Sequence, residues 1–541
     1  MRRGPLILLA GACAVLAACG ARPTRPPCPA GKTCLEYGVS AEPASLDPQK
    51  ASTTTETAII GDFMVGLIED GPDGKPLPGL AERWSSSADR LTWTFHLRPA
   101  VWSDGVRVTA NDFVFAWRRM LDPKTASPNA FILQVLANGE AVNAGRAPPQ
   151  ALGVRAIEAR TLEVRLAHPA PQLLQLLKHA SFYPLPEHAV ARWGDGWAQP
   201  GRYVADGPFI PVSWKLGDRL QATKNPRFFD AAKVCLDRVA YYPTTDAVAA
   251  ERRVKRGELD VSNSIQSNRV AYLRGRGGMG AYVRVHPYLG VAYIAFNSRD
   301  VPALKDRRVR RALSMAIDRE FITGKLLRAG QTPAYAFTPP GMADYRNPLP
   351  PVWASWPLAR RQAAARGLLA QAGFGPAHPL RIELKLPNTS DPSLYAPAIQ
   401  ADWKAVGVEA SLALNEPQIA FAAYRIRDFQ AGIASWIADD DDPMSFLGLM
   451  QSKTGQRNYA GYDNPAYDAL LAQADREADA VRRGGDLARA EAIMLDDAAV
   501  APLYVTVSRN LVDPRVTGWV DNMADIHRAR YLCLPPRVHQ P

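Results

Sequence analysis

The chain has 541 residues, of which 47% are hydrophobic and 22% charged, and its formal net charge is +11. This length exceeds one hydrophobic core, so two or three lobes are expected, and the composition excludes disordered chains and small disulfide-stapled scaffolds. The excess positive charge alternates with acidic residues and comes without a nucleic-acid-binding motif, so we interpret it as solvated surface near anionic lipid and predict no nucleic-acid partner.

The N-terminal stretch MRRGPLILLAGACAVLAACG has two arginines, a short apolar run and small residues before Cys19, as in a secretory signal. The run is too short to span a membrane. Because LAAC resembles a bacterial lipobox, residues 1–19 are predicted to be a lipoprotein signal, with Cys19 as the lipid anchor. An ordinary cleaved signal with an incidental cysteine is the alternative. The proline-rich residues 20–34 read as a tether to the extracytoplasmic or periplasmic face of the membrane.

Four cysteines lie outside the signal segment: Cys28, Cys34, Cys235 and Cys533. Four cysteines allow three pairings. We favour bridges between Cys28 and Cys34 and between Cys235 and Cys533, because an exported protein meets an oxidising compartment. The cysteine spacing does not match a zinc site, and no metal or cofactor is predicted.

The first predicted elements of the folded body are a strand and a helix. LTWTFHL (residues 91–97) alternates apolar and polar residues, as in a half-buried strand. TANDFVFAWRRML (residues 109–121) predicts a helix that opens with a capping box between Thr109 and Asp112.

Further along, VAYIAFN (residues 291–297) is nearly all apolar and predicts a strand covered on both faces. Residues 306–327 predict one helix capped by Asp306. RIELKL (residues 381–386) reads as a half-buried strand, and DNPAYDALLAQA (residues 463–474) as a helix capped by Asn464. The alternation of strands and helices indicates a mixed α/β fold. Nucleophile-elbow, Walker and HExxH signatures are absent from the sequence, so an enzyme is not predicted.

One acidic run, SWIADDDDPMSFLGLM (residues 435–450), attracts attention in a basic chain. Pro443 suits the first helical position, which makes Asp442 a helix cap. A calcium loop would need glycine where Met444 stands, and a hydrolytic carboxylate pair has no partner residue. The remaining alternatives are a solvated surface run and a ligand site in which Asp439, behind Trp436, offers its carboxylate to a cation.

Several segments, taken in order, resemble the extracellular solute-binding proteins, family 5, of peptide ABC importers, and specifically their oligopeptide-binding branch. The resemblance covers nearly the whole chain after the tether. Its landmarks are SLDPQK, GLAERW, TWTFHLRPAVWSDGVRVTANDFVFAWRRMLDPKTAS, SWKLGDRL, NPRFFD, NSRDVPALKDRRVRRALSMAIDRE, TPAYAFTPP and WIADDDDPMSFL.

The resemblance implies a two-lobed α/β fold of the periplasmic-binding-protein type, with an added third domain and discontinuous lobes joined by hinge segments. The expected boundaries are residues 35–72, 188–290 and 507–541 for lobe I, 73–187 for the additional domain II, and 291–506 for lobe III.

The resemblance also suggests roles for individual residues. It implies that Asp439 neutralises the α-amino group of a bound peptide and that Trp436 lines the same pocket. Tyr293 and Glu56 are expected to face the cleft; the alternatives are a core position for Tyr293 and an exposed surface position for Glu56.

Two departures from relatives concern the pocket edge. Relatives of this branch carry an arginine and a histidine that help to hold a peptide's terminal carboxylate, where this chain has Ile433 and Ser393. Arg425 and Arg427 lie nearby with different spacing. A cysteine pair of some relatives is replaced by Gly290 and Ile437.

We therefore expect a monomeric lipoprotein that captures oligopeptides, closes around them and delivers them to the permease subunits of an ABC transporter. Within transport, a murein peptide or a cationic small solute such as a metal chelate is the alternative ligand. A peptide hydrolase would need a nucleophile or metal site, and a folding chaperone would need exposed apolar surface instead of one saturable cleft.

Overall fold

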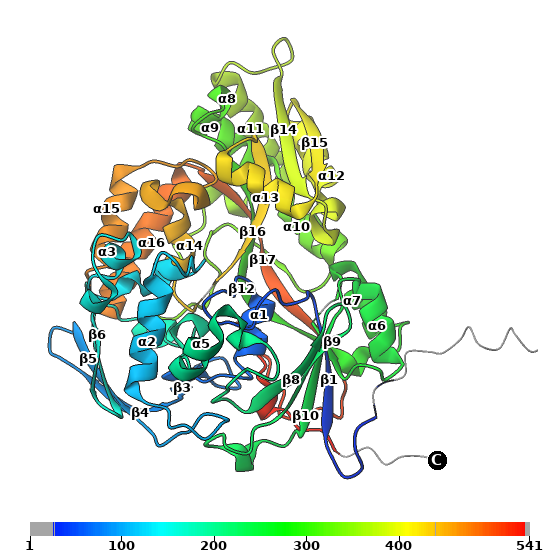
Figure 1. Cartoon of the computed structure of the whole chain (residues 1–541). Coiled ribbons are helices and arrows are strands. Elements are labelled where there is room, and N and C mark those ends of the chain that lie inside the picture. The colour runs from blue at the N-terminus through cyan, green and yellow to red at the C-terminus, as the bar shows by residue number, and fades with distance from the viewer. Residues whose placement is uncertain (1–24, 26, 264, 439, 536–541) are drawn as a thin grey trace, which may run out of the picture.

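The computed structural model describes residue 25 and residues 27–263, 265–438 and 440–535. Strands and helices alternate along these ranges, and the fold is mixed α/β, as predicted from the sequence. Figure 1 shows a lower body that contains the first part of the chain and an upper body built mostly from residues after 290. We call the lower body lobe I with domain II and the upper body lobe III, after the divisions expected from the sequence.

One large sheet runs through both bodies. Its order is β15 (Val408–Asn415), β14 (Leu380–Pro387), β16 (Ala431–Ile437), β12 (Val283–Phe296), β17 (Val500–Val512), β11 (Val261–Ser262), β1 (Cys34–Val39), β10 (Arg238–Pro243), β9 (Arg219–Lys224) and β8 (Phe209–Lys215), with β13 (Thr332–Pro333) beside β17.

Strands β12 and β17 connect the two bodies. They pair antiparallel from Val283 opposite Leu511 to Ala295 opposite Val500. At one end β12 pairs with β16 of lobe III, and at the other β17 pairs with β11 of lobe I. The boundaries expected at 290/291 and 506/507 therefore fall inside two strands that cross between the lobes.

Lobe I and domain II share one hydrophobic core. A separate sheet, β4 (Ala81–Ser86), β5 (Thr92–Leu97), β7 (Thr161–Arg165) and β6 (Val154–Glu158), and a hairpin of β2 (Ile68–Asp70) and β3 (Pro76–Pro78) lie here. The helices are α1 (Thr54–Ile60), α2 (Ala110–Leu121), α3 (Gly139–Asn143), α4 (Leu173–Leu176), α5 (Glu187–Trp193), α6 (Ala247–Lys255) and α7 (Val270–Arg274). Trp117 of domain II and Leu35 of lobe I belong to the same cluster of buried side chains, so residues 73–187 extend the core of lobe I.

Lobe III covers its part of the sheet on both faces. Its helices are α8 (Pro302–Lys305), α9 (Arg307–Ala316), α10 (Arg319–Phe321), α11 (Leu358–Gln371), α12 (Ser390–Ala405), α13 (Pro417–Ile426), α14 (Met444–Leu447), α15 (Pro465–Ala474) and α16 (Ala480–Asp496). Along β12, Ala292, Ile294 and Phe296 join one buried cluster, and Val291, Tyr293 and Ala295 join another. This confirms the prediction that VAYIAFN is a strand buried on both faces.

Local signals in the sequence set several element boundaries. Helix α2 opens with the predicted capping box, in which the amide of Thr109 donates to Asp112 at 2.7 Å. Asn464 caps α15, with Pro465 as its first residue. The predicted strands at residues 91–97 and 381–386 correspond to β5 and β14.

The single helix predicted for residues 306–327 is wrong. Asp306 caps α9 as expected, but Ile317 is extended at φ −73° and ψ 129°. Two hydrogen bonds to side chains replace the helical one at the break. The Asp318 amide donates to the distant Asp402 carboxylate at 2.8 Å, and the Ser314 carbonyl accepts from the buried guanidinium of nearby Arg319 at 2.8 Å. The chain then continues as α10 and a π-helical turn, Ile322–Leu327.

Two disulfides link distant and local segments. They join Cys28 to Cys34 and Cys235 to Cys533, the pairing that the sequence analysis favours, with Cα–Cα distances of 5.8 and 5.3 Å. Cys34 is already the first residue of β1. The described end of the expected tether is attached to lobe I through a 2.7 Å ion pair between Arg25 and Asp260. Cys19 lies outside the described residues.

A cleft between the lobes as candidate functional site

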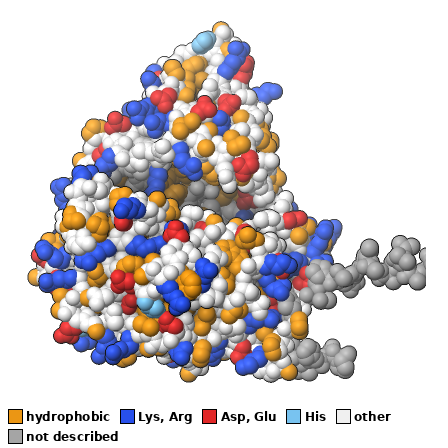
Figure 2. Space-filling model, viewed as in Figure 1, with side chains coloured by type: hydrophobic (Ala, Val, Ile, Leu, Met, Phe, Trp, Pro, Cys, Tyr) orange, Lys and Arg blue, Asp and Glu red, His pale blue; other side chains and the backbone are white. Residues whose placement is uncertain are grey.

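A cleft of about 1010 Å³ opens between the two bodies. Figure 2 shows the surface hollowed at this level. Lobe I contributes residues of α1 and the loop 521–528, lobe III contributes Ile437, Ala438, Asp440 and Asp441, and the crossing strands contribute Tyr288, Leu289 and residues 507–509. The arrangement is an open groove whose opposite walls belong to lobes joined by two strands.

Charged side chains on the lobe I wall of the cleft form ion pairs and hydrogen bonds with other residues of the protein. Arg528 bonds the Asp70 carboxylate at 2.9 Å, and Lys178 lies 3.2 Å from the same carboxylate. Asp62 accepts hydrogen bonds from the Tyr241 hydroxyl and the Ala529 amide. Burial raises the pKa of Asp62 to about 6 and lowers that of nearby His179 to about 4.

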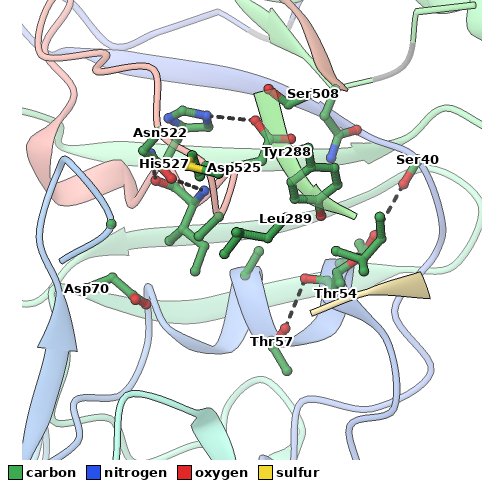
Figure 3. Close-up of a pocket in the computed structure, with 18 of the residues that line it drawn as sticks. Ser40, Thr54, Thr57, Asp70, Tyr288, Leu289, Ser508, Asn522, Asp525 and His527 are labelled. Carbon is green, nitrogen blue, oxygen red and sulfur yellow. Dashed lines mark hydrogen bonds and ion pairs between the residues drawn. The ribbon is translucent and has the colours of Figure 1, made fainter. Parts of the chain in front are cut away.

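A second polar cluster lies around Tyr288 on β12. Figure 3 shows Tyr288, Ser508, Asp525 and His527 around the pocket, with Ser40, Thr54 and Thr57 on another side. His527 lies 3.0 Å from the Asp525 carboxylate. Burial, and secondarily the charge of Asp525, raise the pKa of the Tyr288 hydroxyl. Tyr288 therefore offers the cleft a neutral hydroxyl.

At the C-terminal end of the acidic run, Asp442 and Pro443 start a helix, as predicted from the sequence. Pro443 has helical torsion angles, φ −58° and ψ −25°, and the Asp442 carboxylate accepts from the Met444 amide at 2.8 Å. Asp442 also forms a doubly hydrogen-bonded ion pair with Arg483, both side chains being 7% exposed. That ion pair was not visible in the sequence, because Arg483 lies 41 residues away.

The N-terminal part of the run faces the cleft. Ala438, Asp440 and Asp441 line it, and Asp439, the residue proposed from the sequence, lies outside the described residues. Burial raises the pKa of Asp441, whose carboxylate accepts from the Ala343 amide at 3.1 Å. The cleft therefore has an acidic end at this segment.

Trp436 and its neighbour Ile437 make different contacts. Adjacent residues of a strand point to opposite faces, and Trp436 packs against the buried cluster that contains Tyr293, whereas Ile437 lines the cleft. The indole Nε1 of Trp436 is buried and has no hydrogen-bond partner among the described residues. Ala438, two positions after Trp436, lines the cleft, and a place for Trp436 in the peptide pocket stays a prediction.

Tyr293 is a core residue, so its expected position in the cleft is wrong. Its side chain is 1% exposed, and its ring packs edge-on against Phe337 at a centroid distance of 5.0 Å. The aromatic residue of β12 that reaches the cleft is Tyr288, five positions earlier and outside the part of the strand that pairs with β16.

Glu56 faces neither the cleft nor the surface. It is 1% exposed, and its carboxylate accepts from the amides of Ala44, Ser45, Ser52 and Thr53 at 2.8–3.2 Å. Burial raises its pKa, but these hydrogen bonds outweigh burial and hold the pKa below its usual value. Glu56 is the acidic member of the capping box that starts α1.

A side cavity of about 420 Å³ adjoins the cleft, and Tyr288, Thr389, Ser390, Ile437, Val507 and Arg509 line both. Ile433 lines this cavity, whereas Ser393 does not appear among the residues that line it. Gly290 pairs with Ile437 across β12 and β16, and a Cβ at Gly290 would lie 2.3 Å from Ile437 Cδ1. A larger residue at position 290 would therefore require the side chains of Ile437 and Thr506 to move.

Within the described ranges, no group of three or more His, Cys, Asp and Glu side chains could hold a metal ion. No helix in those same ranges has the length and apolar content needed to cross a membrane. The fold and the cleft define the class of two-lobed solute-binding proteins.

Comparison with known proteins agrees with that class. Residues 75–458 match the family model of bacterial extracellular solute-binding proteins, family 5. The chain belongs to this family. It is 38% identical to the periplasmic oligopeptide-binding protein OppA of Salmonella typhimurium, over 91% of this chain and 90% of that protein. Identity to the periplasmic murein peptide-binding protein MppA of Escherichia coli is 35%, over 93% of each.

Solved structures of MppA resemble this chain over nearly its whole length. Against a structure of the Escherichia coli protein, the TM-score is 0.83 at 34% identity, with coverage of 93% of this chain and 99% of that one. Against the unliganded open form, it is 0.77 at 35% identity, over 93% and 98%.

Proposed function

We propose that the protein is the substrate-binding lipoprotein of an ABC transporter, which captures oligopeptides in the cleft between its lobes and delivers them to the membrane permease. The observation that carries the proposal is the cleft of about 1010 Å³, with walls from both lobes and carboxylates in its lining. The names of the relatives, oligopeptide-binding and murein peptide-binding proteins, support a peptide as the ligand.

The acidic end of the cleft is proposed to hold the α-amino group of the peptide. A charge-assisted hydrogen bond from an ammonium to a carboxylate contributes roughly 1.5–3 kcal/mol. Asp439 is assigned this role from the sequence, and the cleft-lining positions of Ala438 and Asp440 on either side support the assignment.

The test uses a mixed pool of tri- to pentapeptides. Binding should raise the melting temperature, since a ligand at a hundredfold excess over Kd stabilises the folded state by about 2.7 kcal/mol. Closure around the ligand should also reduce the scattering radius. Peptide masses should stay unchanged. Time-dependent cleavage would indicate a hydrolase instead, and no response to any peptide would overturn the proposal.

A murein peptide is the second candidate ligand. The likeness to MppA, in sequence and in structure, favours it. Direct competition between a murein tripeptide and an ordinary tripeptide of equal charge, followed by native mass spectrometry, separates the two: the ligand that remains bound is the preferred class.

The lipid anchor is proposed from the lipobox at Cys19. Cys19→Ala should move the protein from the membrane fraction to the soluble fraction, whereas Cys13→Ala, within the signal itself, should leave the distribution unchanged. A Cys19→Ala variant that still sediments with membranes contradicts the anchor.

A further inference from the structure

Positive charge gathers at one edge of lobe I. Residues 247–282, which contain α6, β11 and α7, hold seven Lys and Arg against three Asp and Glu, a net +4 of the chain's +11. Figure 1 places α6 and α7 together at the edge of the lower body. Figure 2, from the same side, shows Lys and Arg side chains along that edge.

These elements form one packed unit. Val254 of α6 and Leu273 of α7 belong to the same small cluster of buried side chains. Because residues three apart on a helix are neighbours, Arg252 and Lys255 lie side by side on the exposed side of α6. The Lys255 ammonium donates to the Gly277 carbonyl at 3.4 Å, which ties α6 to the loop after α7.

The acidic side chains of this unit form ion pairs within the protein. The pairs are Glu251 with Arg269, Glu258 with Arg253 and Arg256, and Asp260 with Arg25, at 2.6–3.4 Å. Four exposed cations of the unit form no ion pair with any described residue: Arg252, Lys255, Arg274 and Arg276. The surface of the unit is therefore cationic without an acidic counterpart of its own.

The chain enters lobe I beside this surface. Arg25, the first described residue, donates to the Gly257 carbonyl at 3.3 Å, two positions after the end of α6. Six positions separate Arg25 from Cys19, the proposed lipid anchor. An extended chain covers about 3.3–3.6 Å per residue, so six residues reach about 20 Å. An anchor at Cys19 therefore keeps this edge of lobe I within about 20 Å of the membrane.

The side chains of this surface suit a layer of phospholipid headgroups. Lys and Arg are attracted to anionic headgroups within about one Debye length, and each contributes roughly a fivefold gain in binding. Tyr272 of α7 is 44% exposed and carries the Arg269 guanidinium over its ring at 4.4 Å. Tyrosine, with an apolar ring and a polar hydroxyl, is enriched at membrane–water interfaces.

We infer that α6, α7 and the loop after α7 form a docking surface for a membrane that contains anionic phospholipid. The cations Arg252, Lys255, Arg274 and Arg276 contact the headgroups, and the short tether holds them within reach. The inference goes beyond peptide binding and rests on the proposed lipid anchor for its geometry. Binding by this surface alone is reversible and screened by salt, so Cys19→Ala still releases the protein at physiological salt.

The test measures cosedimentation of the full-length Cys19→Ala protein with vesicles at low salt, which removes the contribution of the lipid. The vesicles contain phosphatidylcholine alone or phosphatidylcholine with phosphatidylglycerol. The protein should bind the anionic vesicles at least about tenfold more tightly than the neutral ones. Added Arg276→Gln should weaken binding to the anionic vesicles about fivefold.

Two variants of equal net charge separate a local surface from the overall charge of the protein. The first combines Arg252→Gln, Lys255→Gln, Arg274→Gln and Arg276→Gln, and should lose the preference for anionic vesicles. The second neutralises four exposed cations of lobe III, through Lys305→Gln, Lys325→Gln, Arg366→Gln and Lys404→Gln, and should keep the preference within about threefold. An equal loss in the two variants overturns the inference.

Other outcomes also contradict a membrane surface. Equal binding to neutral and anionic vesicles overturns it, and so does binding of soluble heparin by this surface without binding of either vesicle. The vesicle assay uses neither peptide nor lipid anchor, so its failure leaves the proposed function standing. Failure of the anchor is seen separately: a wild-type protein that a high-salt wash removes from cell membranes lacks the lipid.

Discussion

The two ends of the cleft are built in different ways. The acidic end comes from one continuous segment, in which Asp440 and Asp441 line the cleft and Asp442 turns into the protein. The basic end is assembled from separate segments, with Arg509 on β17, Asp391 at the start of α12 and Ser267 of lobe I.

This difference shows that charge alone does not identify a group that binds ligand. Asp442 is one residue from the cleft, yet Arg483 and the Met444 amide use its hydrogen-bonding capacity. Arg509 is also paired, and its partners among the described residues bond Nη1. A charged side chain whose hydrogen-bonding atoms are all used within the protein is structural, whereas one with unused donors or acceptors can bind a ligand.

The largest effect is expected at Asp442. Asp442→Ala should lower the free energy of unfolding by about 3–5 kcal/mol, because it leaves Arg483 buried without its partner. Urea denaturation measures the loss. The exposed Asp463 serves as a matched control, since Asp463→Ala removes an aspartate that lines neither cavity. Equal stability of the two variants contradicts a structural role for Asp442.

The pH dependence of stability should reveal Asp62. Its pKa rises from 3.8 to about 6 on folding, so between these values the folded state holds a proton that the unfolded state releases. Stability contributed by Asp62 therefore falls as pH rises from 4 to 6, by at most about 3 kcal/mol.

Asp62→Asn should thus gain stability relative to the wild type as pH rises, in urea titrations between pH 4 and 7. His179, whose pKa falls from 6.5 to about 4 on folding, should change stability with pH in the opposite direction. It costs the folded state stability as pH falls from 6.5 to 4, so His179→Asn should gain relative to the wild type at low pH. Differences that do not change with pH contradict both assignments.

Asp439→Asn should weaken peptide binding by about ten- to a hundredfold with little change in stability, through loss of a charge-assisted hydrogen bond of roughly 1.5–3 kcal/mol. Titration calorimetry with a tripeptide measures it, and an N-acetylated tripeptide should bind the variant and the wild type alike. The assignment fails if the variant binds the unmodified peptide as tightly as the wild type does.

Glu56→Ala should affect stability and leave binding unchanged. Removing the carboxylate leaves the amides of Ser52 and Thr53 without their hydrogen-bond acceptor, which should lower the free energy of unfolding by about 1–3 kcal/mol. Peptide affinity measured below the melting transition should equal that of the wild type. A loss of peptide affinity without a loss of stability would indicate that Glu56 contacts the ligand in the cleft.

Local signals in the sequence were sufficient for the caps and strands, but not for the contents of the cleft. The Thr109–Asp112 capping box and the Asn464-Pro465 helix start depend on neighbouring residues and were found. The break at Ile317 depends on Asp402 and on carbonyls that only the tertiary fold brings near Arg319.

The same limit explains the site residues. Tyr293 and Tyr288 lie on one strand, and side chains distant in sequence, such as Phe337, bury Tyr293. The burial of Glu56 could not be predicted from its own helix. Its carboxylate accepts hydrogen bonds from the amides of residues 44 and 45, which only the folded chain brings close to it. Nothing near Arg509 in the sequence indicates Ser267 or Asp391 as its partners.

The most direct test of the whole account is a calorimetric comparison of one tripeptide, Ala-Ala-Phe, with free ends and with both ends blocked by acetyl and amide groups. Opposite charges at the two ends of the cleft predict that the unmodified peptide binds intact and at least about a hundredfold more tightly than the doubly blocked one. Equal affinity for the two peptides would contradict recognition of the ligand through its charged ends.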